Sequence, residues 1–191
     1  MLAELELKAM VPDPEALRAR IRRAGAIPGF RGRMTDRRYD RAGELAARDE
    51  VLRIRTYHHR DGSTESVLAW KGATGRSPEG YKLRQEIELA VRSARGAAER
   101  LLGALGYAPV HLIEREVEIY RVEEATVRLE RYPEMDSLVE VEGDPDTIER
   151  AILVTGIPRG DFTPEALSEF VRRYEARTGT PARLSAEGAA W

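Results

Sequence analysis

Segments in which charged and apolar residues alternate constrain the fold of this chain more than any other feature of its sequence. In Glu4-Leu5-Glu6-Leu7-Lys8 the charged residues take every second position, with leucines between them. Because successive side chains of a β-strand point to opposite faces, such a segment has one charged and one apolar face. The pattern returns along the chain: Arg53 and Arg55 alternate with Leu52 and Ile54, Lys82, Arg84, Glu86 and Glu88 with Leu83, Ile87 and Leu89, and Glu140 and Glu142 with Val139 and Val141.

Period-two alternation predicts eight strands that are connected mainly as antiparallel neighbours. Asp61-Gly62 separates two of them, and this dipeptide is a strong signal for a two-residue hairpin turn. Most other connections between strands are too short for the crossover that parallel strands need. We therefore expect an α+β fold with a closed, eight-stranded antiparallel β-barrel, whose strands lie at about residues 3–10, 33–40, 51–58, 65–71, 81–91, 110–121, 125–131 and 137–142.

Four amphipathic helices separate groups of these strands. Each has a start signal, apolar residues at helical spacing and a glycine after its end. The helices need an apolar sheet face to cover, so we expect them on the outside of the barrel, with the charged strand faces lining its interior. They are expected from Asp13-Pro14-Glu15 to Gly25, from Ser93 to about Leu105, from Asp144-Pro145 to Gly156, and from Thr163-Pro164-Glu165 to near Gly179.

The composition of the chain bounds its class. Charged residues make up 34% of the 191 residues, against about 25% in an average domain, yet the net charge is only −2. This balance gives no sign of a nucleic-acid or acidic-membrane partner. The absence of cysteine excludes disulfides, thiolate nucleophiles and cysteine-based zinc sites, and is typical of a reducing compartment. We expect a soluble, cytoplasmic protein with a single tunnel domain over residues 1–179 and a loose tail over residues 180–191.

The expected interior contains cations and carboxylates together. The simplest alternative is that each charged face meets water, as in most antiparallel sheets. Burying either set alone would shift pKa values by several units or destabilise the fold, so mixed charge on an inner wall favours a bound ligand. Arginine and lysine bond phosphate oxygens, and hard carboxylate oxygens hold Mg²⁺ or Mn²⁺. The pattern therefore indicates a polyphosphate bound with its metal.

The segment Glu4-Leu5-Glu6-Leu7-Lys8 resembles the E-x-E-x-K signature of the CYTH superfamily, the triphosphate tunnel metalloenzymes. Within the superfamily, Leu105-Gly106-Tyr107 and Ile119-Tyr120 are similar to class IV adenylyl cyclases, which convert ATP to cyclic AMP and pyrophosphate. Other branches hydrolyse thiamine triphosphate, inorganic triphosphate or nucleoside triphosphates. The resemblance covers about residues 3–175, with further segments in the family's order: Leu52-Arg53-Ile54-Arg55, Trp70-Lys71-Gly72, Lys82 to Glu88, and Glu140-Val141-Glu142-Gly143.

The resemblance also implies roles for individual residues. One divalent ion would neutralise the triphosphate, and a second would activate the attacking oxygen. The implied metal ligands are Glu4, Glu6, Glu130, Glu140 and Glu142. The implied phosphate-binding residues, which would carry the catalysis, are Lys8, Arg53, Arg55, Lys71, Arg84 and Arg115, and further tunnel residues are Lys82, Glu86, Glu88 and Arg128.

Three departures from the family pattern affect the choice of activity. The chain has no His-Phe pair before Glu4, as cyclases usually have; Val117 stands where a second basic residue is usual two positions from Arg115; and Glu130 replaces an aspartate. The missing pair, together with the intact set of carboxylates and cations, favours a metal-dependent triphosphatase acting on inorganic triphosphate or a nucleoside triphosphate such as ATP, whereas Val117 and Glu130 are the residues that would suit a module that binds without turnover. A class IV-type adenylyl cyclase and a non-catalytic polyphosphate- or nucleotide-binding module are the alternatives, and either a monomer or a homodimer is compatible with each.

Overall fold

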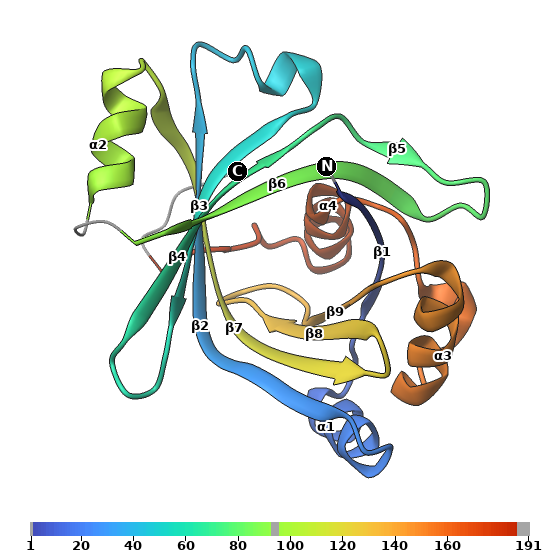
Figure 1. The fold of residues 1–191 in the computed structure, drawn as a ribbon. Coiled ribbons are helices and arrows are strands. Elements are labelled where there is room, and N and C mark those ends of the chain that lie inside the picture. Colours follow the sequence, from blue (N-terminus) through green and yellow to red (C-terminus); the bar gives the residue numbers. More distant parts are fainter. Residues whose placement is uncertain (1, 93–95, 187–191) are drawn as a thin grey trace.

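The computed structural model describes residues 2–92 and 96–186. Eight strands form a closed barrel of antiparallel pairs, in the order β1, β9, β8, β7, β2, β3, β4, β6 and back to β1 (Figure 1). This confirms the predicted barrel, to which a short ninth strand, β5, is added by pairing with β6. The strands are β1 (Leu2–Met10), β2 (Ile27–Asp40), β3 (Val51–His58), β4 (Thr64–Lys71), β5 (Gly75–Arg76), β6 (Lys82–Val91), β7 (Ala108–Val122), β8 (Ala125–Arg131) and β9 (Leu138–Glu142).

Strand β2 begins earlier than the alternating pattern predicted. It starts at Ile27, and its first half pairs with the end of β7. Pro28, Gly29 and Gly32 interrupt the alternation of side chains, so the sequence pattern did not predict a strand there. Glycine is needed at position 32, because a Cβ atom would lie 2.3 Å from the carbonyl oxygen of His58.

Four helices correspond to the four predicted ones, and two short 3₁₀ turns accompany them. The side chains of Asp13 and Asp144 accept hydrogen bonds from backbone N–H groups of the first turn, as expected for helix N-caps. The predicted start of the second helix, at Ser93, lies outside the described residues. Within the described part of the chain, no helix is long and apolar enough to cross a membrane. The helices are α1 (Pro14–Arg23), α2 (Ala97–Ala104), α3 (Pro145–Thr155) and α4 (Leu167–Thr178), and the turns are η1 (Ala46–Arg48) and η2 (Arg159–Asp161).

The fourth helix begins at Leu167, so the predicted start at Thr163 is wrong. The backbone N–H of Thr163 donates to the carbonyl oxygen of Lys8 at 2.8 Å, and the N–H of Lys8 donates to the carbonyl oxygen of Thr163 at 2.9 Å. This β-bridge holds the residues before α4 in an extended conformation beside β1. The first turn of α4 therefore lies next to the barrel interior.

Helices α1, α2 and α3 cover apolar outer faces of the strands, which leaves the charged faces inside, whereas α4 is seen through the opening of the barrel (Figure 1). Helices α1 and α3 contribute Leu17, Ile21, Ile148 and Ile152 to the largest buried cluster. On another side of the barrel, Leu102 of α2 packs with residues of β2 and β3. The strand residues in the largest cluster are Leu7, Ala9, Tyr120, Val122, Ala125, Val127, Leu129, Val139 and Val141.

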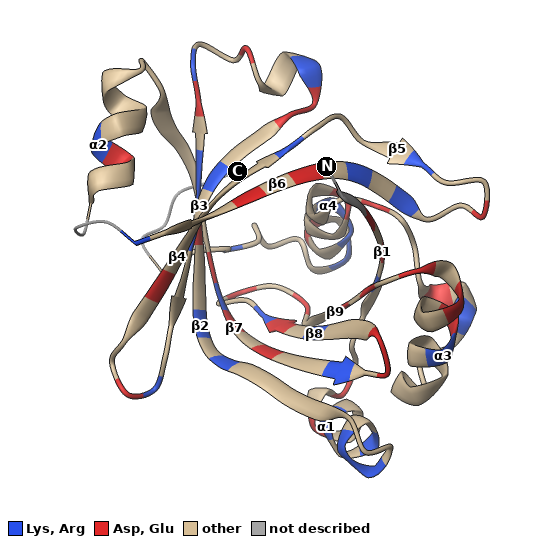
Figure 2. Ribbon diagram, in the orientation of Figure 1, with Lys and Arg blue, Asp and Glu red and all other residues tan. Residues whose placement is uncertain are grey.

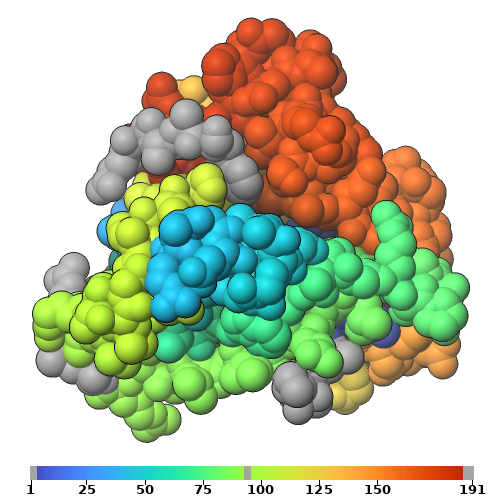
Figure 3. All heavy atoms as spheres, turned by 90° about the horizontal axis from the view of Figure 1, so that it is seen from above, coloured from blue at the N-terminus to red at the C-terminus, as the bar shows by residue number. Residues whose placement is uncertain are grey.

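The segment after α4 was expected to be a loose tail, but its described part packs against the barrel. Leu184 is fully buried in a cluster with Ile113 and Phe170, and its carbonyl oxygen accepts a hydrogen bond from the N–H of Glu114. In Figure 3, the orange and red C-terminal residues gather at one side of the molecule. The segment around Leu184 is short and its residues are mostly small or polar, so its pattern did not indicate that it is buried.

We expect Leu184→Ala to lower the free energy of unfolding by about 2–5 kcal/mol, because truncating a fully buried leucine leaves a cavity. Leu153→Ala is the matched control, since Leu153 on α3 is 78% exposed and its loss should change stability by no more than about 0.5 kcal/mol. Urea unfolding followed by circular dichroism measures both. If Leu184→Ala changed stability as little as Leu153→Ala, the packing of the segment after α4 would contribute nothing to the stability of the fold.

Candidate active site

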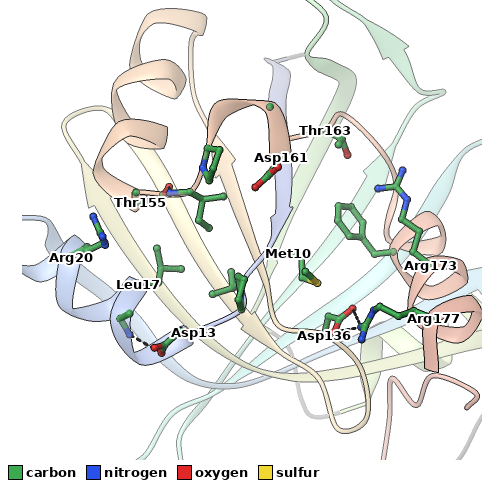
Figure 4. A pocket seen from close by; sticks show the side chains of 18 residues that line it. Met10, Asp13, Leu17, Arg20, Asp136, Thr155, Asp161, Thr163, Arg173 and Arg177 are labelled. Carbon is green, nitrogen blue, oxygen red and sulfur yellow. Dashed lines mark hydrogen bonds and ion pairs between the residues drawn. The ribbon is translucent and has the colours of Figure 1, made fainter.

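Two cavities differ in what lines them. One of about 730 Å³ lies outside the barrel, between α1, the segment that joins α3 to α4, and α4 itself (Figure 4). Its lining is mainly apolar, with Met10, Leu17 and Phe170, and Arg177 at its edge is paired with Asp136 at 2.6 Å. The cavity inside the barrel is smaller, about 210 Å³, but many ionisable side chains converge on it. Because convergent ionisable groups identify catalytic sites better than volume does, the barrel interior is the candidate active site.

Basic side chains outnumber acidic ones around the interior cavity. Of the described residues that line it, nine are basic and five are acidic, and most are less than a tenth exposed. Glutamates outside this lining meet part of the excess, because Glu4 and Glu86 pair with Lys71 and Glu142 pairs with Arg128. The cavity wall itself is rich in cations, which favours a bound polyanion. The basic residues are Lys8, Arg38, Arg53, Arg55, Lys71, Lys82, Arg84, Arg115 and Arg128, and the acidic residues are Glu6, Asp36, Asp49, Glu130 and Glu140.

The topology separates the interior into two walls. Strands β1 and β2 are four places apart in the ring whichever way it is followed, so they face each other across the barrel. The carboxylate wall is formed by β1, β6 and β9, which carry most of the glutamates predicted for the site. The arginine wall is formed by β2, β3 and β7. Figure 2 shows acidic and basic residues interspersed along the strands of the barrel.

Three carboxylates come together on the carboxylate wall. Glu4, Glu6 and Glu142 each offer an oxygen atom, and these oxygens lie within 4.8 Å of one another. The register produces this group, because Glu6 is directly opposite Glu142 in the β1–β9 pair. Hard carboxylate oxygens at this spacing are the donors that Mg²⁺ and Mn²⁺ prefer.

The carboxylate wall has more negative charge than its cations neutralise. Burial raises the pKa of the Glu142 carboxyl well above its usual range; Arg128 opposes the rise and Glu140 adds to it. Oxygen Oε1 of Glu142 is buried without a hydrogen-bond partner among the described residues, although Nη2 of Arg128 lies 3.2 Å away. Burial and a hydrogen bond with Glu4 raise the pKa of Glu86 to about 7. A divalent cation beside these carboxylates would supply the missing charge, so the donor set fits the metal that the fold implies.

The two other predicted metal ligands lie elsewhere. Glu140 is also on β9 but is ion-paired with Lys8 of β1 and Arg128 of β8. Glu130 accepts a hydrogen bond from Nε of Arg115 at 2.9 Å and another from the hydroxyl of Tyr132 at 2.6 Å. Both carboxylates therefore have cationic or hydroxyl partners and are not part of the group of three.

Three lysines of the interior pair with glutamates of the carboxylate wall. They are Lys8 and Lys71, which were predicted to bind phosphate, and Lys82, which was predicted as a further tunnel residue. Lys71 is ion-paired with Glu4 and with Glu86, the latter at 3.0 Å, and Lys82 is paired with Glu6. Lys8 bonds to Glu6 at 2.7 Å. These lysines balance the carboxylate wall.

Two other predicted tunnel residues lie near the rim of the barrel. Arg84 donates to the carbonyl oxygens of Gly72 at 2.6 Å and Asp49 at 2.5 Å, so it fixes the turns at the rim. The side chain of Glu88 is 48% exposed, and its nearest cation is Arg53 at 3.9 Å. Arg53 is closer to Glu86, at 3.2 Å.

The arginine wall is organised around an aspartate that the sequence analysis did not select. Asp36 of β2 is buried between Arg55, which donates from Nε at 2.8 Å and from Nη2 at 3.1 Å, and Arg115, which donates from Nη2 at 2.9 Å. Nη1 of Arg53 lies 3.7 Å away. The register could have indicated this residue, because Asp36 is directly opposite Arg55 in the β2–β3 pair.

Several arginine donors of the interior, two on the arginine wall and one on β8, have no acceptor among the described residues. Among the described residues, Nε of Arg53, Nη1 of Arg115 and Nε of Arg128 are buried without a hydrogen-bond partner. A buried donor left unsatisfied costs about 1–3 kcal/mol, so an anion with several oxygens in the cavity would stabilise this arrangement. Residues Ala166 to Ser168, at the start of α4, also line the cavity.

Comparisons with known proteins bear on the family and the fold. The family model of the CYTH domain matches residues 2–150. The PH1819 protein from Pyrococcus horikoshii is 23% identical with a TM-score of 0.70, over 89% of this chain and 98% of that one. A putative adenylate cyclase from Vibrio parahaemolyticus is 16% identical with a TM-score of 0.71, over 88% and 97%. HpAC1 from Hippeastrum, described as a putative adenylyl cyclase with a dominant triphosphatase activity, is 19% identical with a TM-score of 0.60, over 97% and 99%. No curated protein sequence matches the chain.

We expect Glu142→Gln to weaken Mn²⁺ binding at least about ten-fold, the loss typical even of residues that only support a metal ligand. Glu130→Gln is the matched control, because Glu130 bonds to Arg115 and Tyr132 and should leave the affinity unchanged. Titration of free Mn²⁺ by electron paramagnetic resonance measures both without any turnover. If Glu130→Gln weakened binding as much as Glu142→Gln, the three-carboxylate group would not be the metal site.

Proposed function

This chain belongs to the CYTH domain family, and on that premise we propose that it is a divalent-metal-dependent hydrolase of triphosphates that acts inside the barrel. The observation that carries the proposal is the division of the interior into two walls, with unsatisfied arginine donors facing three clustered carboxylates. Phosphate oxygens would accept from the arginine wall, and the metal of the substrate would meet the carboxylates. Inorganic triphosphate and nucleoside triphosphates are the substrates with this chemistry.

The chain's own residues would bind and align the transferred group. Arg53, Arg55 and Arg115 would bond to phosphate oxygens from one side, and Lys8 from the other. In a site shielded from water, these charge-assisted hydrogen bonds draw negative charge off the phosphoryl group as it is transferred. A bound Mg²⁺ or Mn²⁺ supplies neutralisation of phosphate charge and activation of the attacking water, and the three clustered carboxylates are the residues that would hold it.

The size of the interior supports hydrolysis. Its volume of about 210 Å³ is below the range of about 300–1,000 Å³ that is usual for sites enclosing drug-sized ligands. A triphosphate chain fits such a space, whereas a nucleoside attached to it would extend beyond the cavity. Cyclisation needs the ribose 3′-hydroxyl fixed against the α-phosphate, whereas hydrolysis needs only the triphosphate and water. The triphosphatase activity described for HpAC1 points in the same direction.

A class IV-type adenylyl cyclase is the second candidate. The observation in its favour is the similarity of the barrel to the putative adenylate cyclase from Vibrio parahaemolyticus, at a TM-score of 0.71. This likeness concerns the fold, and the departures at Val117 and Glu130 concern the site.

The test is to incubate the purified protein with Mn²⁺ or Mg²⁺ and either inorganic triphosphate or ATP, and to resolve orthophosphate, pyrophosphate and cyclic AMP. We expect orthophosphate without cyclic AMP. Arg55→Ala should lower kcat/KM by about 100-fold or more, as the loss of a preorganised donor to a developing anion does elsewhere. Arg150→Ala is the control, because Arg150 lies on the surface of α3, paired with Glu123, and its loss should leave kcat/KM unchanged.

Other outcomes separate the alternatives. Cyclic AMP with pyrophosphate would establish the cyclase. A rise in melting temperature with triphosphate and metal, without any product, would establish a binding module, because a ligand that binds only the folded state stabilises it.

A further inference from the structure

Asp36 contacts three arginines of the interior, Arg53, Arg55 and Arg115. Its side chain is 3% exposed, and its contacts with Arg55 and Arg115 are hydrogen bonds of 2.8–3.1 Å. Arg53 lies at 3.7 Å from Oδ2. Although burial opposes it, the pKa of Asp36 is held well below its usual range by Arg55 first and then by Arg115 and Arg53. Asp36 is therefore an anion with both oxygens engaged.

These contacts leave some arginine N–H donors without an acceptor among the described residues. Arg115 uses Nε for Glu130 and Nη2 for Asp36, and its Nη1 is buried without a partner among the described residues. In Arg53, Nη2 bonds to Glu86 and Nε is likewise left over. A guanidinium is planar and rigid, so fixing two of its nitrogens also fixes the direction of the third. In Arg115 two nitrogens are bonded, so Asp36 and Glu130 together fix the direction of Nη1. In Arg53 only Nη2 is hydrogen-bonded, and the Asp36 carboxylate holds its Nη1 by charge at 3.7 Å.

A role for Asp36 as a metal ligand does not fit this geometry. Both of its oxygens accept from guanidinium groups, and β2 lies across the barrel from the β1 glutamates that cluster with Glu142. A role in charge balance alone would not need a bidentate contact with Arg55 and a third bond from Arg115. Such geometry is typical of a carboxylate that sets the orientation of its arginines.

We infer that Asp36 is a positioning residue, which holds Arg53, Arg55 and Arg115 so that their remaining N–H donors face the triphosphate. This inference rests on the proposed hydrolysis. Asp36 touches neither the substrate nor the reacting atoms, and acts through the arginines. The negative charge of Asp36 also keeps the three positively charged arginines close together before substrate binds. The same negative charge cancels one of the positive charges that would otherwise attract the substrate.

Comparing Asp36→Asn with Asp36→Glu separates a positioning role of Asp36 from a role in charge balance. We expect kcat for inorganic triphosphate to fall by about 10- to 100-fold, since small misplacements of binding groups cost this much. KM should stay the same or fall, because the wall becomes more positive and attracts the polyanionic chain more strongly. Asp36→Glu keeps the charge but moves the carboxylate by one methylene, so kcat should fall for this variant too. Asp146→Asn, on the exposed start of α3, is the control and should match the wild-type protein.

The outcomes are distinct. If Asp36→Glu matched the wild-type kcat while Asp36→Asn did not, Asp36 would only balance charge and the inference would be wrong. The inference would also be wrong if both variants matched the wild-type kcat. It would be wrong again if kcat stayed unchanged while KM rose and the melting temperature fell, because such a result indicates a structural role alone. A wild-type protein that hydrolyses no triphosphate would instead overturn the proposed function.

Arginine side-chain NMR on the wild-type protein tests the inference without any variant that has to fold. We expect the Nε–H signal of Arg55, bonded to Asp36, to exchange slowly with water and to move little when tripolyphosphate is added. The Nε–H of Arg53, which has no partner in the part of the chain that the structure describes, should shift clearly. Exposed Arg60 in the β3–β4 turn is the reference for fast exchange. If Arg55 exchanged as fast as Arg60, Asp36 would not hold it and the inference would fail.

Discussion

The cost of burying charge governs the whole interior of this barrel. A closed sheet with apolar residues outside, under helices, must place its charged residues inside, where each needs a partner. The structure meets this demand with chains of alternating charge that run from strand to strand. Lys8, for example, lies between Glu6 and Glu140, and Glu140 also bonds to Arg128. The strands are thus joined by ion pairs as well as by backbone hydrogen bonds.

The pairing is incomplete in two places, and these two places define the chemistry. On the arginine wall, donors of Arg53 and Arg115 have no acceptor among the described residues. On the carboxylate wall, Glu142 lacks a full counter-charge. A polyanion and a divalent cation are together complementary to these two deficits, and neither alone would satisfy both. The barrel topology keeps the deficits apart, because β1 and β2 lie on opposite sides of the ring.

Alternation predicted the strands well wherever one face was charged and the other apolar, as in β1, β3 and β6. It predicted only the second half of β2, because Pro28, Gly29 and Gly32 interrupt the alternation in the first half. Asp36 was overlooked, since nothing in its local sequence distinguishes it from a solvated aspartate. The start of α4 was misplaced because the bridge between Thr163 and Lys8 joins distant segments, which no local cap signal can indicate. Which carboxylates cluster and which are paired with arginine depends on register, and only the folded sheet provides it.

The closure of the ring by β1 has a consequence for folding. The N-terminal strand pairs with β6 on one edge and with β9 on the other, so both of its contacts join segments far apart in the chain. Contacts of high sequence separation form slowly, because the entropy of closing long loops must be overcome first. Glu6 and Glu142 become neighbours only when β1 pairs with β9. Divalent cations that bind the three carboxylates would therefore act on the closed state alone, and should slow the opening of the seam between β1 and β9 more than the opening of any other strand pair.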